Sequence, residues 1–218
     1  MTQEPEHTGE VPDDRPRVRM TGRERREQLV QIGRALFAEK GFDATSIEEI
    51  AARAKVSKPV VYEHFGGKEG LYAVVVDREM SDLLARLTAA LSSGHARELS
   101  EQAALALLTY IEEEPDGFHL LSRDSRGGST GAFSSLLNDV AGQVEHVLAN
   151  EFDRQGIRTE FASMYAQMLV GMVALTGMWW LEERTPRREV VAAHIVNLGW
   201  NGLARLDPDP KPLDDRPT

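Results

Sequence analysis

Apolar residues recur at helical spacing in almost every segment between residues 19 and 206, and this periodicity restricts the possible folds more than any other feature of the chain. In the first such segment, Leu29, Ile32 and Leu36 fall on one stripe of a helix. No segment alternates polar and apolar residues between turn dipeptides, so we expect no β-strand. The sequence therefore predicts an all-α protein with helices over about 21–40, 46–54, 58–64, 68–92, 98–113, 115–123, 132–155, 159–183 and 187–206.

Composition divides the chain into four parts. Residues 1–18 and 207–218 are rich in proline and acidic residues and poor in apolar ones, which predicts two disordered tails. Between them we expect a three-helix domain over 19–66 and a larger helical domain over 67–206. The longest break within the larger domain, residues 122–131, has the composition of a flexible loop.

Charge is distributed unevenly along the chain. Residues 17–68 hold eleven Lys and Arg against seven Asp and Glu, a net charge of +4, although the whole chain carries −10. The overall acidity argues against a protein that coats nucleic acid by bulk charge, whereas a small basic module suggests a partner of its own. The absence of cysteine excludes disulfides, thiolate zinc sites and cysteine nucleophiles and fits a cytoplasmic protein. The first twenty residues lack the apolar block of a signal peptide.

The stretch after the first predicted helix has the pattern of a helix-turn-helix, which presents its second helix to the major groove of DNA. The residues from Thr45 to Glu48 have the form of a capping box for the first short helix, and Ser57 is the expected cap of the second. Val61 and Phe65 are expected to face inward and anchor that second helix. Hydroxyls and free N–H groups at helix N-termini are good phosphate ligands, so the pattern favours DNA binding.

The 25-residue stretch ATSIEEIAARAKVSKPVVYEHFGGK, which begins at Ala44, closely resembles the DNA-binding signature of the tetracycline-repressor (TetR) family. The resemblance extends over residues 23–76, and the segments WWL and LGWNGL near the C-terminus look like one of the family's C-terminal domains. It implies a homodimeric, all-helical transcription regulator, usually a repressor. Its C-terminal domain would bind a small ligand that changes the spacing of two DNA-reading heads.

Residue chemistry and the resemblance together predict a DNA-contacting set. Its members are hydroxyl, basic and aromatic residues at the two helix N-termini and along the second helix, with a basic cluster near residue 25 against phosphates or the adjacent minor groove. The predicted set is Arg23, Arg25, Arg26, Thr45, Ser46, Ser57, Lys58, Pro59, Val60, Tyr62, His64 and Lys68.

Two residues depart from the family pattern. Lys55 stands at a turn position where the family often has glycine, and a left-handed backbone there would cost about 1 kcal/mol. Glu63 places an acid on the predicted recognition helix, where it either faces solvent or accepts a hydrogen bond from a cytosine amine.

Structural roles compete with DNA contact at several of these positions. Tyr62 and His64 could seal the edge of the small core, and the arginines near residue 25 could be a solvated helix face paired with Glu24 and Glu27. Only the register of the whole set favours DNA. A ligand-binding or protein-interaction module without specific operator binding is the alternative function.

Residues 164–181 are nearly all apolar and reach the lower length limit for a membrane span. We expect no membrane span, because Gln167 lies inside the run and charged residues follow it at once. A helix that is apolar on all sides is also expected when one face packs in its own subunit and the other meets a partner. The last two predicted helices are therefore expected to build a four-helix dimer interface.

A ligand pocket is expected within the larger domain. Methionine and aromatic side chains suit an apolar guest, although they are also ordinary core residues. The absence of a buried-looking charge cluster favours a lipid-like or aromatic effector. The predicted lining is Tyr110, Phe118, Phe133, Tyr165, Met168, Met172 and Trp179.

No catalytic motif is found in the sequence. The six histidines are scattered, and the zinc-protease, nucleophile-elbow, P-loop and dinucleotide-binding patterns are missing. We therefore expect a protein that is not an enzyme and that needs no cofactor and no metal.

Overall fold

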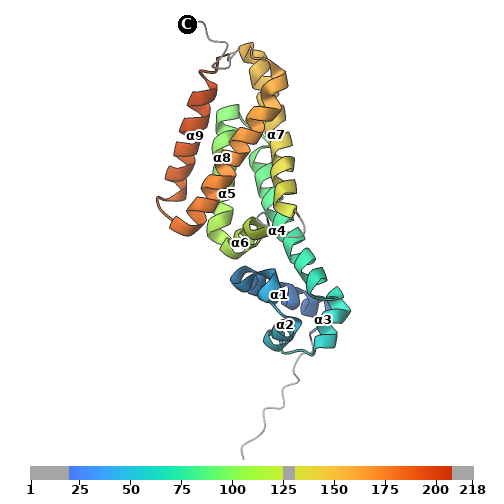
Figure 1. Cartoon of the computed structure of the whole chain (residues 1–218). Helices are drawn as coiled ribbons and strands as arrows, with labels where there is room; N and C mark the ends of the chain where they lie inside the picture. Colours follow the sequence, from blue (N-terminus) through green and yellow to red (C-terminus); the bar gives the residue numbers. More distant parts are fainter. Residues whose placement is uncertain (1–19, 125–130, 208–218) are drawn as a thin grey trace, which may run out of the picture.

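The computed structural model describes residues 20–124 and 131–207, and within these ranges the chain is helical without a strand, as predicted (Figure 1). The helices are α1 (Gly22–Ala44), α2 (Ile47–Ala54), α3 (Lys58–Phe65), α4 (Lys68–Ala90), α5 (Ala96–Glu113), α6 (Pro115–Asp124), α7 (Ala132–Gln155), the short 3-10 helix η1 (Thr159–Phe161), α8 (Ala162–Glu183) and α9 (Arg188–Leu203).

The helix ends follow local sequence signals. Thr21 caps α1, since its hydroxyl accepts a hydrogen bond from the Glu24 N–H while the Glu24 carboxylate accepts one from the Thr21 N–H at 2.7 Å. Gly41 has a φ of 81° and takes the chain out of the helical path near the end of α1. Glycine adopts this left-handed region without a steric penalty, which is why the break falls at this residue, three residues before α1 ends at Ala44.

The capping prediction for the second helix is wrong by one residue. Ser46 precedes α2, and its hydroxyl accepts a hydrogen bond from the Glu49 N–H at 3.2 Å. Thr45 is only 2% exposed, and its hydroxyl donates to the carbonyl oxygen of Gly41 at 2.8 Å. The carbonyls at the end of α1 have lost their helical partners, and the threonine hydroxyl satisfies one of them. Its side chain is therefore inside the domain and is not placed to bind phosphate.

The expected break at residues 122–131 begins too early, because α6 continues to Asp124. Ser122 is buried, and its hydroxyl donates to the carbonyl oxygen of His119 at 3.0 Å. The rest of that loop, the expected N-terminal tail and nearly all of the expected C-terminal tail lie outside the described residues.

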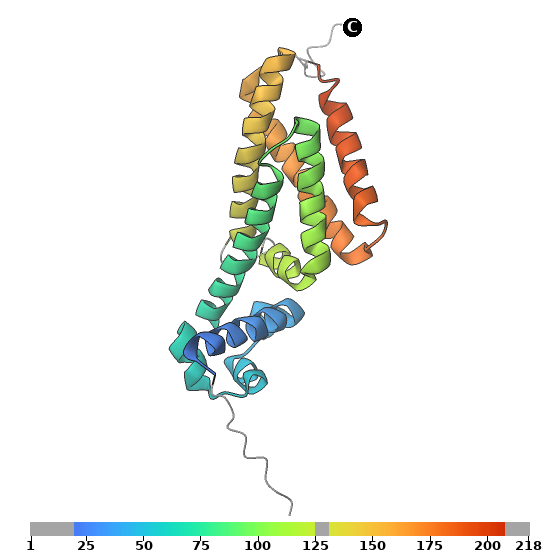
Figure 2. The same cartoon turned by 180° about the vertical axis from the view of Figure 1, so that it is seen from behind.

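Helices α1 to α3 and the start of α4 form a small unit around one apolar centre (Figure 2). Leu36, Ile50, Val61 and Leu71 come from these four helices and are fully buried. Gly33 lets α4 approach α1, since a Cβ at this position would lie 2.8 Å from the Leu71 side chain. The packing holds α3 firmly by its inner side and leaves the other side outward.

The remaining helices form an elongated body above this unit (Figure 1). Helix α8 packs along α7, α9 packs along α5, and α4 runs from the small unit into the body. At the lower end of the body, α6 packs against α1. Helices α4 and α6 are therefore the two structural links between the parts.

By length and composition the segment Thr159–Glu183 could cross a membrane. In its most apolar stretch of 18 residues, 28% is buried inside the protein. It lies beside α7 as an integral part of the body. Most of its buried side is built from small residues, Ala162, Ala166 and Ala174 among them, and Trp180 and Leu181 are buried near its C-terminal end.

Candidate DNA-binding surface and ligand cavity

Helix α3 is held by a tight turn and one deeply buried residue. Lys55 adopts the left-handed conformation that the family pattern usually assigns to glycine, with φ 54° and ψ 45°, at a cost of about 1 kcal/mol. The backbone turns back towards α2 at the next residue, Val56, whose N–H donates to the Ala51 carbonyl oxygen at 2.9 Å. Val61 has no exposed surface and anchors α3, whereas Tyr62 beside it is 53% exposed. The turn and the anchor present the outer side of α3 to solvent.

The predicted DNA-contacting residues differ in their exposure to solvent. Thr45 is buried, as described above. Arg25, Arg26, Val60, His64 and Lys68 are half-buried. The exposed members are Arg23, Ser46, Ser57, Lys58, Pro59 and Tyr62.

The hydroxyl at the N-terminus of α3 is available to a ligand. Ser57 caps the helix by its backbone position, but its side chain makes no capping hydrogen bond. The first N–H groups of a helix have no intrahelical acceptor and carry partial positive charge, so they attract phosphate. Pro59 has no N–H, and the Val60 N–H donates to the Ser57 carbonyl oxygen at 3.1 Å, so the Ser57 hydroxyl and the Lys58 N–H are the groups that can bind a phosphate oxygen here.

Several basic groups of the predicted set already have partners within the chain. Arg26 stacks over the Phe65 ring, with its guanidinium carbon 4.7 Å from the ring centroid. The Lys68 amino group donates to the Phe42 carbonyl oxygen at 3.0 Å and lies 4.2 Å from that ring's centroid. Both residues therefore hold the domain together, whatever further contact they make with DNA.

The arginines near residue 25 do not pair with Glu24 and Glu27, as the alternative interpretation of a solvated helix face would require. Glu24 caps α1, and Glu27 pairs with Arg78 of α4 at 2.6 Å rather than with a neighbouring arginine. Arg25 donates to Gln28 at 2.5 Å, and Arg23 is exposed with no side-chain partner among the described residues. Arg23 is therefore the member of the cluster most free to reach DNA.

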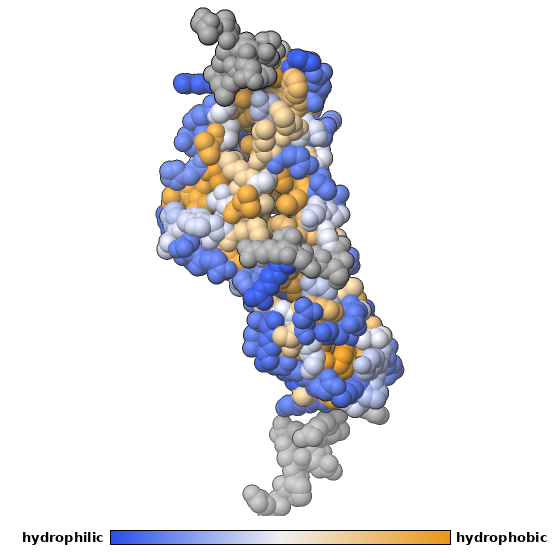
Figure 3. Space-filling view, in the orientation of Figure 1, coloured by the Kyte–Doolittle hydropathy of each residue, from blue (hydrophilic) through white to orange (hydrophobic). Residues whose placement is uncertain are grey.

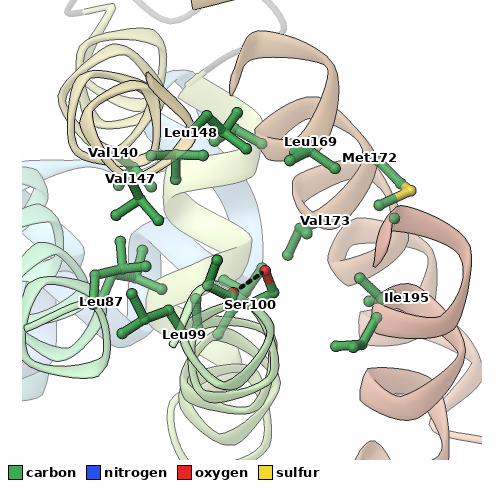
Figure 4. A pocket seen from close by; sticks show the side chains of 18 of the residues that line it. Leu87, Leu99, Ser100, Val140, Val147, Leu148, Leu169, Met172, Val173 and Ile195 are labelled. Atoms are coloured by element: carbon green, nitrogen blue, oxygen red, sulfur yellow. Dashed lines mark hydrogen bonds between the residues drawn. The ribbon is translucent and has the colours of Figure 1, made fainter. Parts of the chain in front are cut away.

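A long apolar cavity lies inside the body between α4, α5, α7, α8 and α9 (Figure 4). The space open to the centre of a water-sized sphere is about 120 Å³, many times the ~10–15 Å³ that one water needs. Leucine and valine predominate, with Leu87, Leu99, Val140, Leu148 and Val173 pointing into the space (Figure 4). An apolar cavity of this kind suits an apolar guest.

The cavity takes in three of the seven predicted lining residues, Phe118, Phe133 and Met172. The other four lie elsewhere. Tyr110 is fully buried and bonds a carboxylate, Tyr165 packs edge-on against Phe152, and Met168 and Trp179 are exposed by 56% and 50%.

The residues that sequence reasoning missed are mainly leucines and valines, which come from α4, α5, α7, α8 and α9. On α7 the lining residues follow one side of the helix from residue 133 to residue 155, which is the stripe expected for any helix that faces a core. The same stripe fits a filled core and a cavity wall, because periodicity reports only which side of a helix faces inward.

Comparisons with known proteins agree with this arrangement. Residues 29–75 match the model of the family described as "Bacterial regulatory proteins, tetR family", and residues 85–212 match the model described as "Tetracyclin repressor-like, C-terminal domain". The two matches cover the small unit with the start of α4 and nearly the whole body.

The chain belongs to the TetR family of bacterial transcription regulators.

The relatives of this chain include proteins named as activators and proteins named as repressors. The transcriptional activator FasR of Mycolicibacterium smegmatis is 27% identical over 185 residues, which cover 84% of each chain. The transcriptional repressor KstR2 of Rhodococcus jostii is 28% identical over 148 residues, 66% of this chain and 63% of that protein. The fold matches the crystal structure of a TetR-like regulator from Rhodococcus sp. RHA1 with a TM-score of 0.72 at 23% identity, covering 85% of this chain and 99% of that one.

An apolar surface covers one side of this TetR-family regulator, over α8 and α9. Figure 3 shows hydrophobic side chains gathered on the body, whereas the small unit is mostly hydrophilic. The large exposed apolar residues of the two helices are Met164, Met168, Leu175, Trp179, Val190 and Leu198. Met168, which was predicted as cavity lining, thus lies on the outside, whereas Met172 lines the cavity. We call these six residues the α8–α9 face.

A polar cluster joins the DNA-binding unit to the body. Arg34 of α1 donates to Glu79 of α4 at 2.7 Å and to Glu114 at 2.6 Å. The Tyr110 hydroxyl of α5 donates to the second Glu79 oxygen at 2.7 Å. Burial, together with the Glu79 carboxylate, raises the pKa of Tyr110, so this hydroxyl remains a donor. Gly117 of α6 fits tightly here, since a Cβ would lie 1.8 Å from a Glu79 oxygen.

Proposed function

We propose that this TetR-family regulator is a cytoplasmic homodimer that binds a palindromic operator, acts as a repressor, and is released from DNA by a small hydrophobic effector. The observation that carries the DNA-binding part is the presentation of α3, with Val61 buried as an anchor and Ser57, Lys58 and Tyr62 exposed beside it. A rigid helix whose N-terminal residues are exposed is what insertion into the major groove needs.

The α8–α9 face supports the dimer. Leu175 and Leu198 are 68% and 67% exposed, which is unusual for leucines on two adjacent helices of one surface. Contiguous apolar surface of this kind marks an interaction site. A two-fold pair would cover the face with its own copy and would present two α3 helices to half-sites about one helical turn of DNA apart.

The cavity supports a hydrophobic effector, and the polar cluster supports a mechanical link to DNA. Phe118 of α6 lines the cavity, and α6 packs on α1. A guest that displaces α6 would act on α1 through Arg34, which is bound to Glu79 and Glu114. Among fold neighbours, FadR from Bacillus halodurans is described as a fatty acid degradation regulator, in line with a lipid-like effector.

The rival function is a ligand-binding module without specific operator binding. A gel shift against promoter fragments over a salt series separates the two. Specific binding persists at moderate salt, whereas binding by charge alone fades steeply as salt rises. Uniformly weak, salt-sensitive binding to every fragment would favour the rival.

Tyr62→Ala is expected to weaken operator binding at least about tenfold, because an aromatic side chain on α3 is lost from the DNA interface. Unfolding free energy should change by less than about 0.5 kcal/mol, since the ring is more than half exposed. Fluorescence anisotropy with labelled operator and a urea titration measure the two quantities. Glu101→Ala, an exposed change on α5, is the control and should alter neither.

Lys68→Ala should behave differently from Tyr62→Ala. The Lys68 amino group bonds the Phe42 carbonyl oxygen and lies over its ring, so its removal should cost about 1–2 kcal/mol of stability as well as operator affinity. Thermal unfolding compared with Tyr62→Ala checks this. Equal melting temperatures for the two variants would show that the contact with Phe42 is unimportant.

Glu79→Gln is expected to reduce the effect of effector on DNA binding while retaining both binding events. The substitution keeps the shape but weakens the ion pair with Arg34 and the hydrogen bond from Tyr110, at a cost of about 1–3 kcal/mol in this largely buried cluster. The ratio of operator affinities with and without effector is the measurement. An unchanged ratio would mean that coupling does not pass through this cluster.

A further inference from the structure

The cavity wall is almost devoid of polar side chains. Of the thirty described residues that line it, three have a hydroxyl, carboxylate or amide side chain, Ser100, Glu151 and Gln155. Trp200 adds an indole N–H, and none of these described residues is Lys, Arg or His. The one charged group that meets the cavity is therefore an anion. This inventory restricts the chemistry of any guest.

All three polar residues lie at the end of the body that is farther from the DNA-binding unit. Ser100 is in the first turns of α5, and Glu151 and Gln155 are in the last turns of α7, where both helices reach the top of the body in Figure 1. The opposite end is closed by Phe118 and Phe133, whose rings pack edge-on with centroids 6.1 Å apart.

The shape of the cavity is long and narrow. Lining residues follow one side of α7 from Phe133 to Gln155, a rise of about 33 Å at 1.5 Å per residue. A space of 120 Å³ spread along such a length accommodates a chain more readily than a broad ring system.

The polar groups at the far end offer mainly hydrogen-bond acceptors. The Gln155 amide N–H donates to one Glu151 oxygen at 2.6 Å, and the Ser100 hydroxyl donates to the Ala96 carbonyl oxygen at 2.9 Å. What remains open to a guest is the unused lone pairs of the Glu151 carboxylate, the Ser100 hydroxyl oxygen and the Gln155 carbonyl oxygen, with the second Gln155 N–H and the Trp200 indole N–H as uncharged donors. A guest whose polar end donates a hydrogen bond fits these groups.

Resting on the function proposed above, we infer that the effector is an uncharged long-chain molecule with a hydrogen-bond donor at one end, such as a primary alcohol. The donor lies at Glu151 and Gln155, and the chain runs down the cavity towards Phe118. The effector is not a carboxylate or a phosphate ester.

An anionic end group is disfavoured here for two reasons. A carboxylate that enters this apolar space loses its water and finds no cation in the wall to replace it. At the polar end it also meets the like charge of Glu151. The nearby Arg154 pairs with the Glu151 carboxylate at 3.1 Å, but it is largely exposed and is not one of the lining residues.

The test compares three molecules with the same twelve-carbon chain on the full-length protein at pH 7.5. 1-Dodecanol, dodecanoate and dodecanoyl-coenzyme A each compete with N-phenyl-1-naphthylamine, an uncharged fluorescent probe. Dodecanol is kept below its solubility limit, and the other two are kept below their micelle-forming concentrations. Dodecanol is expected to bind at least about tenfold more tightly than the other two, a difference of about 1.4 kcal/mol. Equal or tighter binding of dodecanoate or its coenzyme A ester would overturn the inference, as would failure of dodecanol to displace the probe.

Glu151→Gln distinguishes the charge at this position from the general polarity of the cavity. It preserves size and removes the negative charge, so dodecanoate should gain about three- to tenfold in affinity while dodecanol changes little. Glu145→Gln, an exposed change on the same helix outside the cavity wall, is the matched control and should leave both affinities unchanged. An unaltered dodecanol-to-dodecanoate ratio in Glu151→Gln would contradict the assignment.

These readouts measure ligand binding alone. If dodecanoate binds best and releases the protein from its operator, the proposed function stands and this inference falls. If no promoter fragment is bound specifically, the proposed function falls whatever the ligand ranking.

Discussion

Gly70→Ala is expected to destabilise the DNA-binding unit by about 3 kcal/mol or more and to abolish operator binding. A Cβ at this position would lie 1.9 Å from the carbonyl oxygen of Phe65 and 3.1 Å from its carbonyl carbon. These are backbone atoms at the end of α3, so no side-chain rotation relieves the clash. Either α3 or α4 must shift, and overpacking of this kind costs several kcal/mol in a well-packed core.

The consequence for DNA follows from where the clash falls. Phe65 is the last residue of α3, and Gly70 lies in the first turn of α4, the helix that joins the DNA-binding unit to the body. A shift of α3 relative to α4 would change the orientation of Tyr62 and Ser57 relative to the body. Urea unfolding followed by circular dichroism and a gel shift with operator measure the two effects.

Gly142→Ala is the matched control. This glycine lies in the middle of α7, and a Cβ there meets nothing within 4 Å. Alanine should leave operator binding unchanged and raise stability by about 0.5–1 kcal/mol, because alanine is the better helix former. If Gly70→Ala proved as harmless as Gly142→Ala, the close approach of α3 and α4 would be disproved.

Leu175→Glu is expected to convert the proposed dimer into a monomer and to lower operator affinity at least about 100-fold. Leu175 is the most exposed large apolar residue of the α8–α9 face. In a two-fold dimer the new carboxylate would be buried in an apolar interface on both protomers without a cation to pair with it. A monomer presents one reading head instead of two, and a loss of about 2.8 kcal/mol is already a factor of 100.

Sedimentation velocity and operator anisotropy measure this prediction. The folded monomer should keep its helical signal, because Leu175 is outside the protomer's own core. Ala85→Glu places the same charge on an exposed position of α4 and should leave the dimer intact. A Leu175→Glu protein that remains dimeric with full operator affinity would show that the α8–α9 face is not the interface.

The helices and the recognition element could be predicted from sequence because their signals are local. Apolar spacing gave the helical segments, glycine at position 41 marked the end of α1, and the serine at position 57 marked the start of α3. The left-handed turn at Lys55 was also foreseeable, since the family pattern has glycine there. Each of these features depends on a few neighbouring residues.

The missed features depend on contacts between distant parts of the chain. Thr45 and Ser46 are both good capping residues, and only the packing of α1 on α2 decided which one is buried. Arg34 meets acids 45 and 80 residues away, and nothing near it in the sequence identifies them.

Sequence alone determined that this chain is an all-helical TetR-type protein and predicted its recognition helix over about residues 58–64, because helix propensity, capping and turn chemistry act over a few residues. Tertiary structure alone decided that Met164 and Met168 face outward, that leucines and valines of α7 line the cavity, and that the charged residue of its described wall is Glu151. Periodicity identifies the sides of a helix but not what each side meets, since that is set by where distant helices come to lie.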